Sequence, residues 1–230
     1  MRLAGLQKLT LLDFPGHVAC TVFTPGCNFR CPFCHNTPLV TGTDDPEYPL
    51  EDFFCFLQKR QGVLDGVAIT GGEPLLHGDI DVFIRRIRAL GFAVKLDTNG
   101  AFPDRLKPLI DEGLVDYVAM DIKNRPEKYE QTAGVSGILP AVQKSAALLT
   151  ENRVPYEFRT TLVDELHEPE DFEAIGRWLE GTDRYFIQGF VDSGSILADG
   201  MHGADKEKTA ACLAAVRKYL PGAALRGAEE

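Results

Sequence analysis

The sequence contains no run of about 18 or more apolar residues, and this absence excludes a membrane-spanning helix. Its first residues lack the long apolar core of a secretory signal, so we expect a cytoplasmic protein. Basic residues are also scarce, because 24 Lys and Arg stand against 34 Asp and Glu, for a net charge of −10. An acidic chain repels phosphate backbones, and we therefore expect no nucleic-acid partner. Because the sequence has no apolar span, we expect no membrane partner either.

Cysteine is sparse as well, with six residues in 230, but half of them lie close together. Cys27, Cys31 and Cys34 share one short segment, with spacers of three and two residues. In the cytosol disulfides are rare, and grouped cysteines more often hold metal. The other three are isolated, and we expect them to pack as small hydrophobic residues: Cys20, Cys55 and Cys212. An alternative is that one of these three cysteines serves as a fourth metal ligand.

The grouped cysteines fit a [4Fe–4S] cluster better than a zinc site. Three thiolates can ligate three irons of the cube and leave the fourth open, whereas an electron-transfer cluster normally has four thiolates. The alternative is a non-catalytic protein, either an electron carrier or a zinc site in which His35 completes a Cys3His set. Zinc sites usually take their ligands from two separate turns, but these four crowd into nine residues. The pattern therefore favours a catalytic cluster.

Strand-like and helix-like stretches alternate along the chain. Short apolar runs predict six strands, at residues 18–23, 66–70, 93–97, 117–121, 156–162 and 185–188. Apolar residues at helical spacing predict six helices, at 50–60, 79–90, 104–112, 138–151, 169–180 and 205–219. Residues 41–49 and 191–203 are expected to be loops.

Strands separated by helices of this length imply parallel pairing with right-handed crossovers. We therefore expect one α/β domain over residues 1–230, with a core at about 15–190 and residues 191–230 as a C-terminal loop and helix. The residues alone leave two architectures open, a partial barrel and a doubly wound sheet.

Polar residues follow successive predicted strands, and in parallel α/β folds the chemistry gathers at these carboxyl ends. The first strand leads into the cysteine segment. The next three end in Thr70-Gly71-Gly72-Glu73-Pro74, Asp97-Thr98-Asn99-Gly100 and Asp121-Ile122-Lys123. Each has a structural explanation on its own: a tight turn, an Asn-Gly turn and a surface ion pair. Because all fall at the same end of the sheet, together they predict one site.

The spacing Cys27-x3-Cys31-x2-Cys34, with Phe33 before the last cysteine, resembles that of the radical S-adenosylmethionine (SAM) enzymes. Gly71-Gly72-Glu73-Pro74 is similar to the glycine-rich motif of that superfamily. Further segments resemble the anaerobic ribonucleoside-triphosphate reductase activating proteins, a branch of the glycyl-radical-enzyme activases: residues 12–16, 26–36, 96–100, 119–123 and 157–161. The resemblance reaches about Leu162 and fades afterwards.

This resemblance implies a partial (βα)6 barrel in which Cys27, Cys31 and Cys34 hold a [4Fe–4S] cluster. The fourth iron of the cluster would chelate the amino and carboxylate groups of SAM. The resemblance places Phe33 beside the adenine. It places Gly72 and Glu73 at the methionine ammonium.

The resemblance also implies a monovalent cation near the SAM carboxylate, held by Asp97, Thr98 and Asp121, with Lys123 paired to that carboxylate. A related activase uses a histidine after a later strand, where this chain has Gln188-Gly189-Phe190-Val191 and no match. Arg159 lies on a predicted strand, either as a binding group inside the barrel or in a structural ion pair.

The implied activity is that of an oxidoreductase. A one-electron donor such as flavodoxin or ferredoxin would reduce the cluster, and SAM would be cleaved to methionine and a 5′-deoxyadenosyl radical. That radical would remove hydrogen from a glycine of a partner, anaerobic ribonucleoside-triphosphate reductase, with no catalytic side chain beyond the cluster and SAM. Activation of another glycyl-radical enzyme and radical chemistry on a small molecule are the alternatives.

Overall fold

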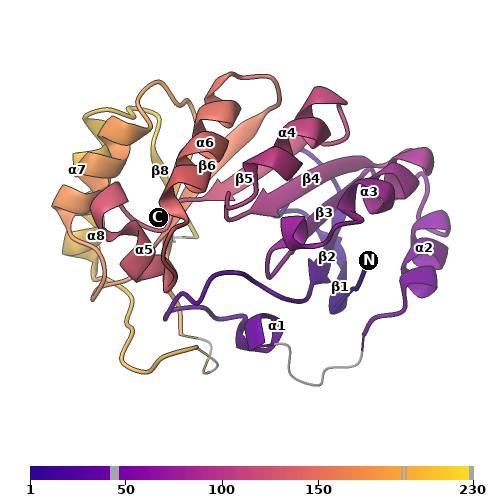
Figure 1. Cartoon of the computed structure of the whole chain (residues 1–230), viewed down its shortest axis with the longest axis horizontal. Helices are drawn as coiled ribbons and strands as arrows, with labels where there is room; N and C mark the ends of the chain where they lie inside the picture. The colour runs from indigo at the N-terminus through magenta and orange to yellow at the C-terminus, as the bar shows by residue number, and fades with distance from the viewer. Residues whose placement is uncertain (42–46, 193, 195, 228–230) are drawn as a thin grey trace.

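The computed structural model describes residues 1–41, 47–192, 194 and 196–227 (Figure 1). Within these residues one sheet has eight strands in the order β1 to β8. The strands are β1 (Gly5–Thr10), β2 (Ala19–Thr24), β3 (Gly66–Gly71), β4 (Ala93–Thr98), β5 (Tyr117–Asp121), β6 (Tyr156–Leu162), β7 (Tyr185–Gly189) and β8 (Ala224–Arg226). β1 pairs antiparallel with β2, and every other neighbouring pair is parallel.

The strand order decides between the two architectures that the sequence left open. A doubly wound sheet reverses its strand order at a switch point, but here β2 to β7 follow one another without reversal. Right-handed crossovers then place the connecting helices on one face, and the sheet curves around the other. Figure 1 shows α3 (Ile80–Ala89), α4 (Pro103–Asp111) and α6 (Leu139–Thr150) on one side of the strands. The fold is an open, partial barrel, as predicted.

The six predicted strands and the six predicted helices are all present, with ends that differ by a few residues. Besides the three just named, the predicted helices are α2 (Leu50–Gln58), α7 (Pro169–Trp178) and α8 (Lys206–Arg217). Of the predicted loop at 41–49, residues 42–46 lie outside the described part, as do residues 193 and 195 of the loop at 191–203.

Four further strands and α-helices carry too little local signal for the sequence pattern to predict them: β1, β8, α1 (Thr37–Thr41) and α5 (Pro126–Ala133). β1 is an edge strand with partly exposed residues, and β8 has three residues. α5 is short and mostly polar, with proline at its first position. Tertiary pairing stabilises these elements where hydrophobic periodicity does not.

The core follows the periodicities seen in the sequence. α3 buries Ile80, Phe83, Ile84 and Ile87, which form one helical face. Strands β2 to β5 are buried almost throughout, as expected for a parallel sheet covered by helices. No helix among the described residues is long and apolar enough to cross a bilayer.

The isolated cysteines only partly follow expectation. Cys20 and Cys212 are fully buried, but Cys55 is exposed on α2, so its predicted packing in the interior is wrong. The reason is that α2 turns Phe53, Phe54 and Leu57 inward and leaves position 55 on the solvent side.

Candidate functional site

A cavity of about 350 Å³ opens at the carboxyl ends of the parallel strands. All but one of the residues predicted for the site line it: Cys27, Cys31, Phe33, Cys34, Gly72, Asp97, Thr98, Asp121 and Lys123. The exception within the described chain is Glu73, which lies behind the wall. Neither Cys20 nor Cys55 nor Cys212 lines this cavity, and so none stands where a fourth thiolate would be needed.

The cysteine segment leaves β2 and is held in place by α5. In Figure 1 it crosses beneath the sheet toward α5, on the side away from α4 and α6. The Arg30 amide donates to the carbonyl of Ala133, the last residue of α5, at 2.8 Å. Gly134 ends the helix at φ +69°, and a Cβ there would lie 2.2 Å from the Arg30 carbonyl oxygen. α5, absent from the sequence prediction, therefore positions the loop.

Two of the three thiols, those of Cys27 and Cys31, have surroundings that suit metal-bound thiolates. The Cys27 sulfur accepts from the Phe29 amide at 3.4 Å and faces the Asn99 side-chain amide at 3.8 Å. Burial raises the pKa of the Cys31 thiol to about 12, against the opposing field of the Lys123 ammonium. A buried thiol of this kind loses its proton when it binds iron. Positive charge and N–H donors then stabilise the sulfur.

These residues fit a cluster better than a single ion. No group of three His, Cys, Asp or Glu side chains in the described chain is close enough to hold one metal ion. A cube places its three cysteine sulfurs on three separate irons, and they need only surround a shared space. All three thiols line the same cavity, as that arrangement requires.

Two glycines let β3 leave the sheet directly against the cysteine segment. The Gly72 amide donates to Thr24 at 2.9 Å and the Glu73 amide to Gly26 at 2.8 Å. Gly71 has φ +121°, and a Cβ there would lie 2.4 Å from the Thr24 backbone. The two strand ends therefore share one tight interface that has no room for side chains.

The Glu73 carboxylate is fully buried beneath the cavity wall. It accepts hydrogen bonds from the Leu75 amide at 3.0 Å, the Thr98 hydroxyl at 2.9 Å and the Asn99 amide at 2.7 Å. Burial raises the pKa of Glu73 to about 7, although these donors oppose the shift. The carboxylate thus fixes the end of β4, and its contact with the SAM ammonium stays a prediction.

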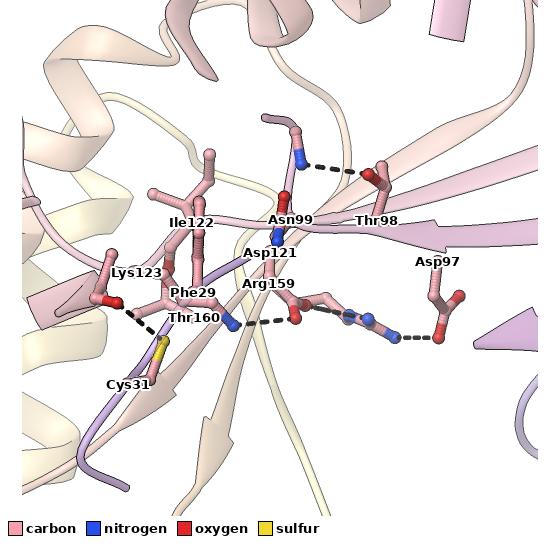
Figure 2. Close-up of polar contacts among 12 residues, drawn as sticks. Phe29, Cys31, Asp97, Thr98, Asn99, Asp121, Ile122, Lys123, Arg159 and Thr160 are labelled. Carbon is pink, nitrogen blue, oxygen red and sulfur yellow. Dashed lines mark hydrogen bonds and ion pairs between the residues drawn. The ribbon is translucent and has the colours of Figure 1, made fainter. Parts of the chain in front are cut away.

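A chain of charges crosses the cavity from β4 to β6 (Figure 2). The Arg159 guanidinium donates to Asp121 at 2.9 Å and to Asp97 at 3.2 Å, and Lys123 donates to Asp121 at 3.0 Å. Burial acts to raise the pKa of Asp121, but Arg159 and Lys123 outweigh it and hold that pKa well below its usual range. Burial likewise acts to lower the pKa of Lys123, and Asp121 reverses the effect, so the ammonium keeps its charge.

Comparison with known proteins identifies the family to which this chain belongs. The sequence matches the Radical SAM superfamily over residues 21–179. It is 34% identical over 192 residues to a Methanocaldococcus jannaschii protein named as a glycyl-radical enzyme activating enzyme, covering 81% of this chain and 79% of that one. The protein belongs to the radical SAM superfamily, in its glycyl-radical-enzyme activase branch.

One further relative agrees with this family, and a solved structure agrees with the fold. A pyruvate formate-lyase-activating enzyme of Listeria monocytogenes is 29% identical over 196 residues, covering 78% of this chain and 76% of that one. The crystal structure of Streptococcus suis SuiB bound to SAM superposes with a TM-score of 0.69 over 91% of this chain. At 16% identity, and with this chain spanning 52% of SuiB, that likeness shows the fold alone.

As a radical SAM protein, the chain uses a [4Fe–4S] cluster and SAM. Phe33 lines the cavity near Lys123, whose Nζ lies 5.9 Å from the ring centroid. Asn99 belongs to a strand-end segment to which the sequence pointed, but sequence patterns assigned its side chain no role in the site. Its side chain donates to Asn28 at 2.8 Å and faces Cys27, but in the sequence it reads as half of an Asn-Gly turn. Its place at a strand end was the only available signal.

Proposed function

We propose that this radical SAM protein is an oxidoreductase that activates a glycyl-radical enzyme, and that its partner is an anaerobic ribonucleoside-triphosphate reductase. The observation that carries the proposal is that three thiols, the Gly72 backbone and the Asp97–Asp121–Arg159–Lys123 charges share one open cavity. Activation is supported by the relatives named for it. The choice of partner is supported by the sequence resemblance of the segments around Gly26, Asp97 and Asp121.

The residues of the cavity suit the parts of SAM. When bound, the reduced cluster supplies the electron that cleaves SAM to methionine and a 5′-deoxyadenosyl radical. Phe33 offers an aromatic ring for the adenine, and the Lys123 ammonium offers a charge for the methionine carboxylate. The volume of about 350 Å³ lies within the range of sites for small molecules. The cavity therefore shields a reactive species while one side stays open to a substrate.

The substrate that we propose is a glycine of the partner, whose Cα would give a hydrogen atom to the 5′-deoxyadenosyl radical, so that 5′-deoxyadenosine forms and the glycine retains the radical. The electron comes from a small carrier such as flavodoxin or ferredoxin. The chain's remaining cysteines are isolated from one another in sequence, and this is typical of a minimal activator without a second cluster.

The proposal is tested with anaerobically reconstituted protein, dithionite and SAM, with 5′-deoxyadenosine measured by chromatography. Adding purified anaerobic ribonucleoside-triphosphate reductase is expected to produce a glycyl radical, detected by electron paramagnetic resonance. Pyruvate formate-lyase added in place of the reductase is the matched control.

The outcomes separate the two parts of the proposal. A glycyl radical on the reductase alone supports both parts, and a radical on pyruvate formate-lyase alone contradicts the choice of partner. A protein with a full cluster that cleaves no SAM, with or without either enzyme, contradicts the activase function.

A further inference from the structure

The sequence resemblance implies a monovalent cation held by Asp97, Thr98 and Asp121, but in the structure protein groups already engage the oxygens of all three. Arg159 donates to one oxygen of Asp97 at 3.2 Å, and Lys95 donates to the other. Arg159 also donates to Oδ1 of Asp121 at 2.9 Å, while Lys123 donates to Oδ2 at 3.0 Å. Each of the four carboxylate oxygens therefore has a cationic donor.

The third predicted ligand is engaged as well. The Thr98 hydroxyl donates to Glu73 Oε1 at 2.9 Å and accepts from the Gly100 amide at 3.1 Å. Its oxygen is thus tied into the buried structure at the end of β4. One lone pair of the Thr98 oxygen accepts from the Gly100 amide, so only the other would be left for a cation at this place.

The sheet itself positions the guanidinium. Arg159 on β6 pairs in register with Asp121 on β5, and β4 with Asp97 lies beyond β5. The side chain reaches from β6 across β5, and Figure 2 shows it between the two carboxylates with a contact to each. Its side chain is 13% exposed and that of Asp97 14%, so solvent screens this pair poorly.

The charges also leave little reason for another cation. Lys95, Lys123 and Arg159 carry three positive charges, and Asp97 and Asp121 carry two negative ones. These five side chains by themselves sum to one positive charge. A sodium or potassium ion here would lie beside three cations that already engage both carboxylates.

We propose that Arg159 takes the place of the monovalent cation, so that SAM binding by this protein requires neither sodium nor potassium. Arg159 is then the positioning residue that holds Asp97 and Asp121 together, beside the Lys123 ammonium that offers its charge to the SAM carboxylate. This inference rests on the proposed function only in that SAM binds in this cavity.

The first experiment measures the dissociation constant of SAM for the reconstituted holoprotein by anaerobic equilibrium dialysis. The salts are potassium chloride, sodium chloride and choline chloride, each at about 0.1 M so that screening is equal. We expect the three constants to agree within about twofold. A loss of affinity of about tenfold in choline chloride overturns the inference.

The second experiment replaces the guanidinium. Arg159→Met keeps an apolar stem but frees one oxygen of each carboxylate, and it is expected to weaken SAM binding about tenfold in choline chloride. Potassium chloride should restore most of the affinity, because the cation can now enter. Arg177→Met, on the exposed face of α7, is the control and should match the unmodified protein in every salt.

Each result has one meaning. An Arg159→Met protein that binds SAM normally in choline chloride, or whose loss potassium does not reverse, overturns the replacement. Should that variant fail to take up iron, the salt series on the unmodified protein decides the question alone. If the unmodified holoprotein binds no SAM in any salt, the proposed function fails instead.

Discussion

The backbone of Gly72 lies against Gly26, so that a Cβ at position 72 would stand 1.9 Å from the Gly26 carbonyl oxygen. This contact joins the end of β3 to the start of the cysteine segment, and the Glu73 amide donates to the same carbonyl at 2.8 Å. Backbone contacts therefore join the part of the cavity wall that carries the thiols to the part that follows β3. A disturbance at Gly72 should reach both.

Gly72→Ala is expected to impair cluster and SAM binding together, because the backbone must shift to admit a methyl group. We expect a loss of about 1–3 kcal/mol in unfolding free energy, as for other overpacked sites. The measurements are iron per chain, SAM affinity and thermal unfolding. Gly78→Ala is the control, since a Cβ there meets nothing within 4 Å. Equal iron content and SAM affinity in both variants would show that the contact is dispensable.

Cys31→Ala should abolish the cluster while the chain stays folded. Cys31 lies in the wall of the cavity and its loss removes one of three thiolates, so iron uptake and 5′-deoxyadenosine formation should both be lost. Iron analysis, visible absorbance and circular dichroism measure the three properties. Cys55→Ala, at an exposed position on α2, should behave as the unmodified protein. SAM cleavage by the reconstituted Cys31→Ala protein would contradict the assignment of Cys31 as a cluster ligand.

Asp121→Asn should weaken SAM binding before it affects the cluster. The Asp121 carboxylate accepts hydrogen bonds from both Arg159 and Lys123. An amide has only one acceptor oxygen and no negative charge, so it cannot replace both contacts. We expect SAM affinity to fall about tenfold, the usual size for a lost charge-assisted contact, with iron content unchanged. Asp104→Asn, exposed on α4, is the matched control. Unaltered SAM affinity in the Asp121 variant would remove this residue from the site.

Glu73 should make stability depend on pH. Burial raises its pKa from 4.5 to about 7, so the folded protein binds a proton more tightly than the unfolded chain does. The extra stability is present below about pH 4.5 and is lost as the pH rises through about 7, by up to about 3 kcal/mol.

Urea unfolding of the anaerobic holoprotein at several pH values measures this effect. Glu73→Gln removes the titrating group, so its stability should change less between about pH 5.5 and about pH 8 than that of the unmodified protein. Parallel pH profiles for the two proteins would show that Glu73 does not titrate in this range.

Local patterns in the chain were enough for the parallel units and for the strand ends that bear the site. The helical spacing of apolar residues in α3 and the apolar run of β3 are patterns that span only a few residues. Such patterns predict a helix or a strand without any tertiary information. β8 was out of reach because its three residues form a strand only by pairing with β7. Cys55 was misjudged because its neighbours are aromatic, while the face that it occupies depends on which side of α2 meets the core.

Cysteine spacing, Gly72 and the acidic strand ends were visible in the sequence because each depends on residues that are close along the chain. The partners of the charges were decided by the tertiary structure. Arg159 meets Asp121 and Asp97 across 38 and 62 residues of sequence, and only the strand register brings the three together. The sequence by itself determined which groups this protein brings to its strand ends. The curvature and register of the sheet decided that Glu73 accepts hydrogen bonds from Thr98 and Asn99 behind the cavity wall. They also decided that Arg159 lies between the carboxylates of Asp97 and Asp121.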